Sequence, residues 1–174
     1  LISGGDGTDT VSYAEEESGI TVDTSNGTVI GASSGTDTLD EVEVIEGTNF
    51  DDTFTGGGLN DTFVGGAGDD TFNAGAGNDA LTLGSGADLV TFKPGDGNDT
   101  ITDFDVATDV LDLTAFPIAG YGALEDMFGT DDNGDMTITF ESGETITLQG
   151  VSPSDVSTEN FAGFDYRAGT EGND

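Results

Sequence analysis

Apolar residues recur every nine positions in the middle of the chain. From residue 47 the sequence divides into nonapeptides at 47–55, 56–64, 65–73, 74–82 and 83–91 and, after two extra residues, 94–102. The eighth position of each copy is apolar: Phe54, Phe63, Phe72, Leu81, Val90 and Ile101. Positions seven to nine are rich in Thr, Phe and Val and are too few for a helix. They therefore predict a three-residue strand whose eighth side chain faces inward.

The first six positions of each copy are polar or small and have a fixed aspartate. Gly holds the second position in every copy but the first, and the sixth position is Asp52, Asp61, Asp70, Asp79, Asp88 and Asp99. Glycine reaches positive φ and lets backbone carbonyls crowd a common centre, so these positions predict a turn. Two repeats form one coil of a solenoid. The spacing therefore predicts that Asp52, Asp70 and Asp88 stack on one edge and Asp61, Asp79 and Asp99 on the other.

The chain has a large excess of acidic residues, which the repeat has to accommodate. The 174 residues include 36 acidic and 2 basic ones, a net charge of -34, with 33% hydrophobic residues. This composition is typical of a chain that does not fold alone, although 11 Phe are unusual in a disordered segment. Carboxylates stacked roughly 5 Å apart repel one another, so we expect bound cations. Carboxylate and carbonyl oxygens suit Ca²⁺, whereas Mg²⁺ demands stricter octahedral geometry and keeps its waters.

A simpler interpretation is that the Gly/Asp turns only connect strands and that their acids are solvated. It is the better interpretation of one repeat, but six copies in register favour calcium. The sequence has no Cys and no His. It therefore has no disulfides, thiolate metal sites, His-based zinc sites or Ser-His-Asp triads. No apolar run approaches the roughly 20 residues of a membrane span, and nucleic acid would be repelled by the negative charge.

The nonapeptides resemble the GGxGxDxUx repeat of the RTX family, whose fold is a calcium-binding parallel β-roll. The resemblance implies several Ca²⁺ ions between successive turns of one edge, held by turn carbonyls and sixth-position carboxylates. The best pair of turns is 65–70 with 83–88, followed by 56–61 with 74–79. The pair 74–79 and 94–99 is weakened by the inserted Phe92 and Lys93.

Turn 47–52 departs from the motif at Thr48 and Phe50, and Leu59 replaces a glycine in turn 56–61. We expect these two turns to bind calcium less well. With the turn Gly4–Asp9, which also fits the motif, the candidate metal-binding residues are Asp9, Asp52, Gly56, Gly57, Gly58, Asp61, Gly65, Gly66, Ala67, Gly68, Asp70, Ala74, Gly75, Ala76, Gly77, Asp79, Leu83, Gly84, Ser85, Gly86, Asp88, Gly95, Asp96, Gly97, Asp99 and Asp109.

The segments on either side predict further β-structure. Residues 19–31 read as a hairpin around 25–27, and residues 34–47 read as a degenerate repeat with Asp37 and Leu39 in the key places. After the roll, Asp103 and Asp109 either close the last calcium site or are ordinary turn acids. Residues 123–128 predict a short helix, 131–135 a tight turn, and 135–140 with 144–150 a second hairpin.

This last segment resembles the β cap that follows the roll in serralysin-type metalloproteases and alginate epimerase R-modules. The fold class is thus all-β: a calcium-bound parallel β-roll with flanking antiparallel caps and at most one or two short helices. We divide the chain into an N-terminal β segment (1–46), the roll (47–111), a C-terminal cap (112–165) and the start of a further repeat (166–174). That final segment suggests a piece of a longer protein with neighbouring domains.

The resemblance implies a calcium-folded, non-catalytic module of a secreted bacterial exoprotein, exported unfolded through a type I channel. It would aid secretion, stability and presentation of a neighbouring domain. An alternative is binding of an extracellular polysaccharide, as in the R-modules, although Lys93 and Arg167 are the only cations available for an anionic glycan. A third hypothesis is a surface-binding ladder made of the outward Thr53, Thr62, Thr71 and Thr100.

Overall fold

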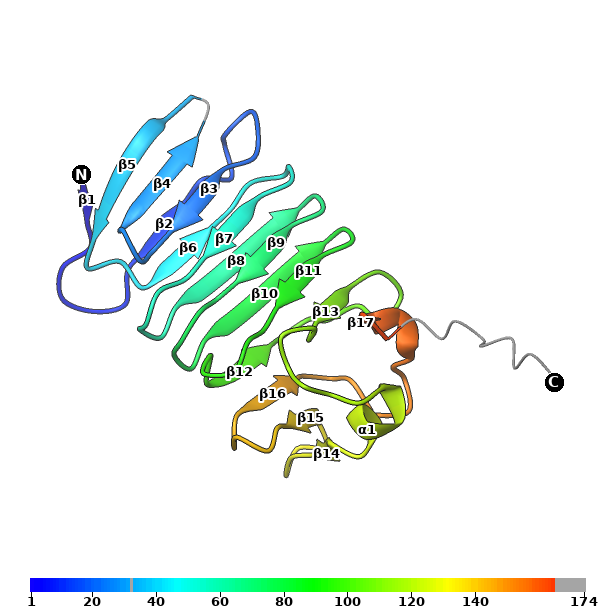
Figure 1. The fold of residues 1–174 in the computed structure, drawn as a ribbon. Coiled ribbons are helices and arrows are strands. Elements are labelled where there is room, and N and C mark those ends of the chain that lie inside the picture. Colours follow the sequence, from blue (N-terminus) through cyan, green and yellow to red (C-terminus); the bar gives the residue numbers. More distant parts are fainter. Residues whose placement is uncertain (32, 165–174) are drawn as a thin grey trace, which may run out of the picture.

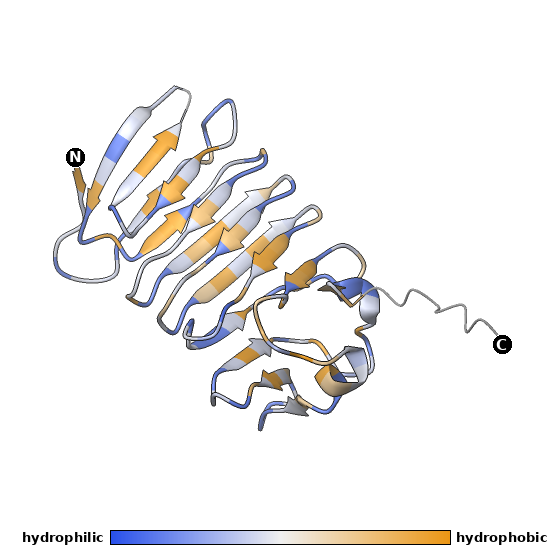
Figure 2. Ribbon diagram, viewed as in Figure 1, coloured by the Kyte–Doolittle hydropathy of each residue, from blue (hydrophilic) through white to orange (hydrophobic). Residues whose placement is uncertain are grey.

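Two sheets of mostly parallel strands face each other along the length of the molecule and are joined by turns at both edges (Figure 1). This computed structural model describes residues 1–31 and 33–164. Hydrophobic residues concentrate on the strands and hydrophilic residues in the turns (Figure 2). The predicted solenoid of parallel strands is confirmed, with antiparallel strands at both ends.

The nine-stranded sheet contains every second strand of the roll and most of the N-terminal insert. Its order is β1 (Ile2–Ser3), β5 (Gly35–Asp40), β4 (Thr28–Gly31), β3 (Thr21–Asp23), β7 (Thr53–Thr55), β9 (Thr71–Asn73), β11 (Leu89–Thr91), β13 (Val110–Asp112) and β17 (Phe161–Ala162).

The eight-stranded sheet contains the alternate strands and the C-terminal cap. Its order is β14 (Phe128–Thr130), β15 (Met136–Thr139), β16 (Thr145–Leu148), β12 (Asn98–Ile101), β10 (Ala80–Ser85), β8 (Thr62–Ala67), β6 (Val44–Glu46) and β2 (Thr10–Ser12). Within residues 1–31 and 33–164 the helices are the five-residue α1 (Tyr121–Glu125) and a 3₁₀ turn, Thr158–Asn160.

The core lies between the sheets and is made by the eighth-position side chains, all of them buried. Phe54 pairs with Phe72 in parallel register, and their rings stack with centroids 4.8 Å apart. Phe63 lies 5.2 Å from Phe54 and joins the two sheets. Burying each such side chain contributes about 1.5–3 kcal/mol. This burial requires both sheets, because a single short strand cannot enclose its own side chains.

The strands of the roll differ in length between the two sheets. β7, β9 and β11 have the predicted three residues, but β8 and β10 have six. The longer strands continue pairing into the glycine turn, where Gly66 lies opposite Gly84. Glycines allow this because their backbones approach closely without a side chain between them.

The N-terminal insert contains the predicted hairpin, since β3 and β4 pair antiparallel. The interpretation of 34–47 as a degenerate repeat is wrong for its first half. Asp37 lies within β5, which pairs antiparallel with β4, and its carboxylate accepts a hydrogen bond from Tyr13 Oη at 3.2 Å. The alternation of Thr36 and Thr38 with Asp37 and Leu39 fits a strand as well as a repeat, and the neighbouring hairpin decides the outcome.

The C-terminal cap covers the last coil of both sheets. β16 pairs with β12, and β17 pairs with β13. The hairpin β15–β16 and the tight turn at 131–135 are confirmed. The helix predicted at 123–128 begins two residues earlier and ends three residues earlier, because Phe128 pairs with Ile138 and begins β14. The segment 166–174, expected to start another repeat, lies outside the described residues.

Candidate metal sites

The sixth-position aspartates form two hydrogen-bonded columns, one on each edge of the roll. On one edge the amide of Asp52 donates to Oδ1 of Asp70 at 2.7 Å, and the amide of Asp70 donates to Oδ1 of Asp88 at 2.8 Å. Asp109 extends this column by accepting from the Asp88 amide at 3.1 Å. The stacking predicted from the nonapeptide spacing therefore holds on this edge.

The second edge has the same arrangement despite the inserted residues. The amide of Asp61 donates to Oδ1 of Asp79 at 2.7 Å, and the amide of Asp79 donates to Oδ1 of Asp99 at 2.9 Å. Phe92 is buried in the core and absorbs part of the insertion. The phase break therefore does not disrupt the column.

Each interior carboxylate uses only one oxygen in these columns. The other oxygen, Oδ2, is buried without any hydrogen-bond partner in Asp70, Asp79, Asp88 and Asp99, and Oδ2 of Asp9, which lies outside both columns, is buried and unpartnered as well. A buried acceptor left unpaired is costly, and native structures hold few of them. Five equivalent orphaned oxygens at equivalent turn positions indicate a missing ligand of positive charge, and a cation fits them.

The electrostatics of these carboxyls point the same way. Burial, with a smaller contribution from neighbouring acids, raises the pKa of Asp70 and Asp99 to about 7 and that of Asp79 and Asp88 to about 6. An ordinary Asp pKa is roughly 3.9. The protein alone therefore holds these negative charges poorly, and a bound cation would favour the charged form.

The glycine turns bring backbone carbonyls next to the orphaned oxygens. A Cβ built on Gly65 would lie 2.3 Å from the Leu83 carbonyl oxygen and 2.4 Å from Asp70 Oδ2. Only glycine leaves this space open, so the two oxygens converge between turns 65–70 and 83–88. A Cβ built on Gly56 would likewise collide with the Ala74 carbonyl oxygen and lie 2.8 Å from Asp61 Oδ2, although that oxygen is not orphaned.

The side chains do not form a metal site by themselves. Across the described ranges 1–31 and 33–164, no three acidic side chains gather around one point. Ca²⁺ takes six to eight oxygens, so backbone carbonyls have to supply most of them. These carbonyls lie in the turns named above, and their assignment as ligands stays a prediction.

Some of the candidate carbonyls also bind the neighbouring turn. Ser85 O accepts from Gly68 N at 2.9 Å, Asp96 O from Gly77 N at 2.7 Å, and Gly57 O from Ala76 N at 2.9 Å. A carbonyl oxygen has two lone pairs, so each keeps one that a cation could use. The turns are thus held together by hydrogen bonds as well as by their shared acidic edge.

Two early column members are satisfied by protein donors instead. Asp52 accepts from Ile20 N at 2.7 Å, from Thr48 N at 2.6 Å and from Thr48 Oγ1 at 3.0 Å. Asp61 Oδ2 accepts from Thr24 Oγ1 and Gly57 N, both at 3.1 Å. These are the two turns that were expected to bind calcium less well. In turn 47–52 the donor is the hydroxyl of Thr48, which stands where the motif has glycine, and in turn 56–61 it is the hydroxyl of Thr24 from the insert.

The acids after the roll fit the interpretation as turn acids better. Both oxygens of Asp103 accept amides, from Leu83 at 2.7 Å and Gly84 at 3.0 Å. Oδ2 of Asp109 accepts from Asp105 N at 2.8 Å. Neither carboxylate has an orphaned oxygen, so Asp109 ends the column by hydrogen bonding.

The side chains at the fifth position of the repeat form a second ladder of hydrogen bonds between neighbouring turns, which was not predicted from the sequence. Asn60 Oδ1 accepts from Asn78 N at 2.9 Å, and Asn78 Oδ1 accepts from Asn98 N at 3.1 Å. On the opposite edge Asp69 N donates to Asp51 Oδ1 at 2.9 Å. The available signal was the run of Asp or Asn at this position, interrupted only by Ala87. In this ladder the amide of the later turn donates to the side chain of the earlier turn, whereas in the sixth-position columns the amide of the earlier turn donates to the side chain of the later one.

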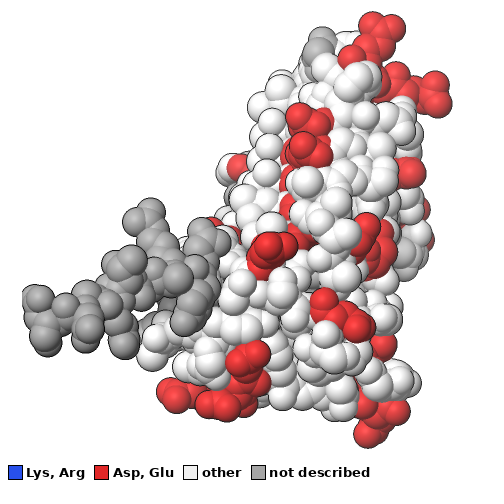
Figure 3. Space-filling view, turned by 90° about the vertical axis from the view of Figure 1, so that its right-hand side faces the viewer, with Lys and Arg blue, Asp and Glu red and all other residues white. Residues whose placement is uncertain are grey.

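The acidic groups lie in separate patches along the length of the molecule on the face seen in Figure 3, where no basic side chain is visible. The alternation of strands and turns explains this distribution. The outward positions of β7, β9 and β11 are Thr53, Thr55, Thr71, Asn73, Leu89 and Thr91, all uncharged. The negative charge of the roll is therefore concentrated at the turn edges.

Comparison with known families identifies the repeat. Residues 55–90 match the RTX calcium-binding nonapeptide repeat in four copies. Residues 55–90 are therefore RTX repeats, and this part of the chain is a calcium-binding β-roll. The turns 47–52 and 94–99 lie outside the match, next to the departures at Thr48 and at the inserted Phe92. No curated protein sequence matches the chain.

Among solved structures, the chain is similar to the extracellular lipase LipA from Serratia marcescens, with 19% identity and a TM-score of 0.45 over 92% of this chain. It spans 33% of the lipase, about a third of its length. It is also similar to the AlgE6R3 subunit of the mannuronan C5-epimerase from Azotobacter vinelandii, with 24% identity and a TM-score of 0.30. That match covers 72% of this chain and 84% of the subunit.

Proposed function

We propose that this chain is a calcium-dependent folding module of a secreted bacterial protein. It is non-catalytic and supports the export, stability and presentation of neighbouring domains in a longer chain. Residues 47–111 form the calcium-dependent roll, and residues 1–46 and 112–165 are its caps. RTX repeats typify secreted extracellular proteins of bacteria. Among the described residues, none of the helices has the length and hydrophobicity of a membrane-spanning segment.

The observation that carries this proposal is the set of five buried, unpartnered Oδ2 atoms in equivalent turns. Without a cation, folding has to bury these carboxylates against one another and against a net charge of -34. The short strands cannot offset that cost together with the conformational entropy of ordering the chain. Calcium binding and folding are therefore one equilibrium.

The calcium requirement would give the chain two states in two compartments. Extracellular calcium modules have dissociation constants on the order of 10⁻⁴–10⁻³ M. A chain with such affinity stays unfolded in a calcium-poor cytosol and folds outside the cell. This behaviour suits export through a narrow type I channel, which an unfolded chain can thread.

A calcium titration of the chain tests the proposal. Far-UV circular dichroism should show a cooperative transition from coil to β-structure with Ca²⁺ and no transition with equal Mg²⁺. A chain already folded in excess chelator would contradict the coupling of calcium to folding. Chain prepared and kept in chelator provides the reference state.

A second candidate function is binding of a neutral polysaccharide to the outer face of β7, β9 and β11. This surface presents uncharged side chains, most of them threonines, in a molecule whose acids lie at the turn edges. The face favours a neutral glycan over an anionic one such as alginate. The ladder hypothesis in its original form is not supported, because Thr53 and Thr71 lie on the nine-stranded sheet while Thr62 and Thr100 lie on the other. Cosedimentation of the calcium-folded chain with insoluble neutral and anionic polysaccharides tests this candidate.

A further inference from the structure

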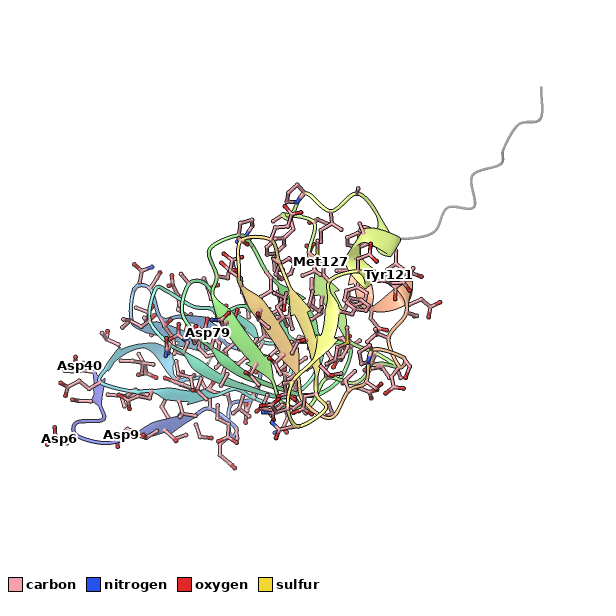
Figure 4. All side chains as sticks on the ribbon, turned by 90° about the horizontal axis from the view of Figure 1, so that it is seen from below. Asp6, Asp9, Asp40, Asp79, Tyr121 and Met127 are labelled. Carbon is pink, nitrogen blue, oxygen red and sulfur yellow. The ribbon has the colours of Figure 1, made fainter. Side chains whose placement is uncertain are left out.

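The C-terminal cap contains an apolar pocket of about 460 Å³ between α1, the loop that follows β13 and the turn between β15 and β16. Figure 4 shows Met127 in the cap, at the end of the molecule away from Asp6, Asp9 and Asp40. None of the residues that line the pocket is among the candidate metal ligands. The apolar part of its wall is made by Pro94, Phe116, Pro117, Ile118, Met127 and Phe140.

Two stacked aromatic rings form the buried part of this wall. Phe116 and Phe140 are buried, and their ring centroids lie 3.8 Å apart at an interplanar angle of 10°. A tight turn fixes the backbone of each residue. Phe116 N donates to Leu113 O at 3.0 Å, and Phe140 O accepts from Gly143 N at 2.9 Å. The rings are therefore in place before any ligand arrives, as in most ligand pockets.

The backbone of the wall offers water few hydrogen-bond donors. Pro94 and Pro117 have no amide hydrogen. The amide of Ile118 already donates to Phe116 O at 2.8 Å. A cavity holds ordered water when polar groups bind that water, whereas an apolar cavity stays dry and takes up apolar molecules.

The polar side chains that line the pocket, among the described residues, come from the exposed turn between β15 and β16. They are Glu141 and Ser142, and the Ser142 hydroxyl donates to Glu144 Oε2 at 3.1 Å. Lys93 precedes Pro94, but it lines an adjoining crevice together with Asp96 and Glu144. The rim of the pocket is therefore acidic in a chain of net charge -34, which repels anions.

We propose that this pocket binds a small uncharged apolar molecule, of the size of a two-ring aromatic compound or a medium-length alkyl chain. Its volume lies within the range of ligand pockets, roughly 300–1,000 Å³, which hydrophobic and aromatic side chains mostly line. The dry aromatic wall selects apolar ligands, and the acidic rim excludes carboxylates and sulfonates. The inference goes beyond the proposed function, in which the cap only covers the end of the roll.

A fluorescence titration of the calcium-folded chain with N-phenyl-1-naphthylamine tests the proposal, since this uncharged dye brightens in an apolar site. Its sulfonate, 1-anilinonaphthalene-8-sulfonate, has the same rings and a negative charge. The uncharged dye should bind saturably, and the sulfonate should bind at least about tenfold more weakly. Absence of saturable binding would overturn the pocket as a ligand site. Equal affinity for both dyes would overturn the uncharged class of ligand.

The two methionines of the chain locate the bound dye. Met127 lines the pocket, whereas Met136 is fully buried in β15 and is not part of the lining. In a chain with carbon-13 methyl groups on methionine, the uncharged dye should shift the Met127 resonance and leave that of Met136 in place. Binding that leaves the Met127 resonance unshifted would place the dye elsewhere and overturn the proposal.

A pair of variants in α1 provides the matched comparison. Ala123 lines the pocket, so Ala123→Phe should fill it. Gly122→Phe adds the same side chain to the same helix, at a position where a built Cβ meets no atom within 4 Å. Affinity for the dye should fall at least about tenfold in Ala123→Phe and stay unchanged in Gly122→Phe. Equal affinities in the two variants would contradict the site. The methionine shifts need no variant, so they decide the question if Ala123→Phe does not fold.

Discussion

The backbone amide of Asp52 donates to Oδ1 of Asp70, 18 residues further along the chain, while the Oδ2 of Asp70 has no partner at all. One carboxylate oxygen thus positions the neighbouring turn, and the other remains free for a cation. An aspartate serves both purposes because its two oxygens point to different places. An asparagine would keep the acceptor but remove the charge.

Asp70→Asn should therefore separate the two roles. The variant retains an acceptor for the Asp52 amide but lacks a charged ligand. We expect the calcium affinity of the site beside Asp70 to fall about tenfold, equivalent to about 1.4 kcal/mol, and the calcium concentration at the folding midpoint to rise. In chelator the variant should be slightly easier to fold, because it buries one charge fewer. Calcium-dependent circular dichroism measures both effects.

Asp132→Asn is the matched control, since it removes one charge from an exposed position in the cap. A midpoint shift as large in Asp132→Asn as in Asp70→Asn would show that total charge matters and the position of the carboxylate does not.

Acidification should promote folding of the calcium-free chain. The pKa values of Asp70 and Asp99 are raised to about 7 and those of Asp79 and Asp88 to about 6 in the folded state, largely by burial. The folded state therefore binds more protons than the unfolded state between roughly pH 4 and pH 7. The free energy of unfolding falls as pH rises through this window. In chelator, β-structure should increase between pH 8 and pH 5.

With calcium present, the pH effect should have the opposite sign. Protons compete with Ca²⁺ for the same oxygens, so the apparent calcium affinity should fall as pH drops below about 7. Calcium titrations at pH 8, 7 and 6 measure this change. A calcium midpoint independent of pH over this range would argue against buried, raised-pKa carboxylates as ligands.

Gly65→Ala should destabilise the calcium-bound roll by roughly 2–3 kcal/mol, because its Cβ would collide with Leu83 O and Asp70 Oδ2. Gly58→Ala is the matched control, since a Cβ there meets no atom within 4 Å. It should be neutral or slightly stabilising, by restricting the unfolded chain. Thermal unfolding in saturating calcium compares the two variants, and equal losses would rule out the close approach at Gly65.

Thr48→Val should weaken the first turn without changing the number of bound ions. The Thr48 hydroxyl is buried and donates to Asp52 Oδ1 at 3.0 Å, so its loss leaves that oxygen with one donor fewer. The expected cost is about 1–3 kcal/mol. Thr71→Val, at an exposed position on the outer face of β9, should be nearly neutral. Unfolding midpoints measure the loss of stability, and counts of bound calcium by dialysis show whether an ion is lost as well. Together they distinguish the loss of the Thr48–Asp52 hydrogen bond from the loss of an ion.

The nonapeptide pattern predicts the roll well because each coil is defined by its own residues. The inward direction of Phe63, Phe72 and Leu81 and the stacking of Asp70 on Asp88 follow directly from the spacing of the repeat. The calcium ligands are less accessible to such reasoning, since the pattern cannot show which carboxylates find other donors. Asp52 resembles Asp70 in sequence, and only the fold shows that Thr48 and Ile20 satisfy it.

The flanking segments were harder to predict for a different reason. Asp37 and Leu39 have the local spacing of a repeat, but they lie in a strand because β4 is beside them. Glu43 carries no motif, and its carboxylate accepts from the Asp9 amide only because the insert returns the chain to the same edge. In each case the deciding contact is distant in sequence.

The 18-residue register between Phe54 and Phe72 makes the roll modular in length. Removing or adding one whole coil keeps every later strand in its own sheet and every later aspartate on its own edge. Changing the length by a single nonapeptide would exchange the two sheets for the rest of the chain and place the cap strands against the wrong partners. Repeats in this architecture can therefore be gained or lost only in pairs. The coil of 18 residues, and not the single nonapeptide, is the segment that can be duplicated or deleted without changing the pairing of the later strands.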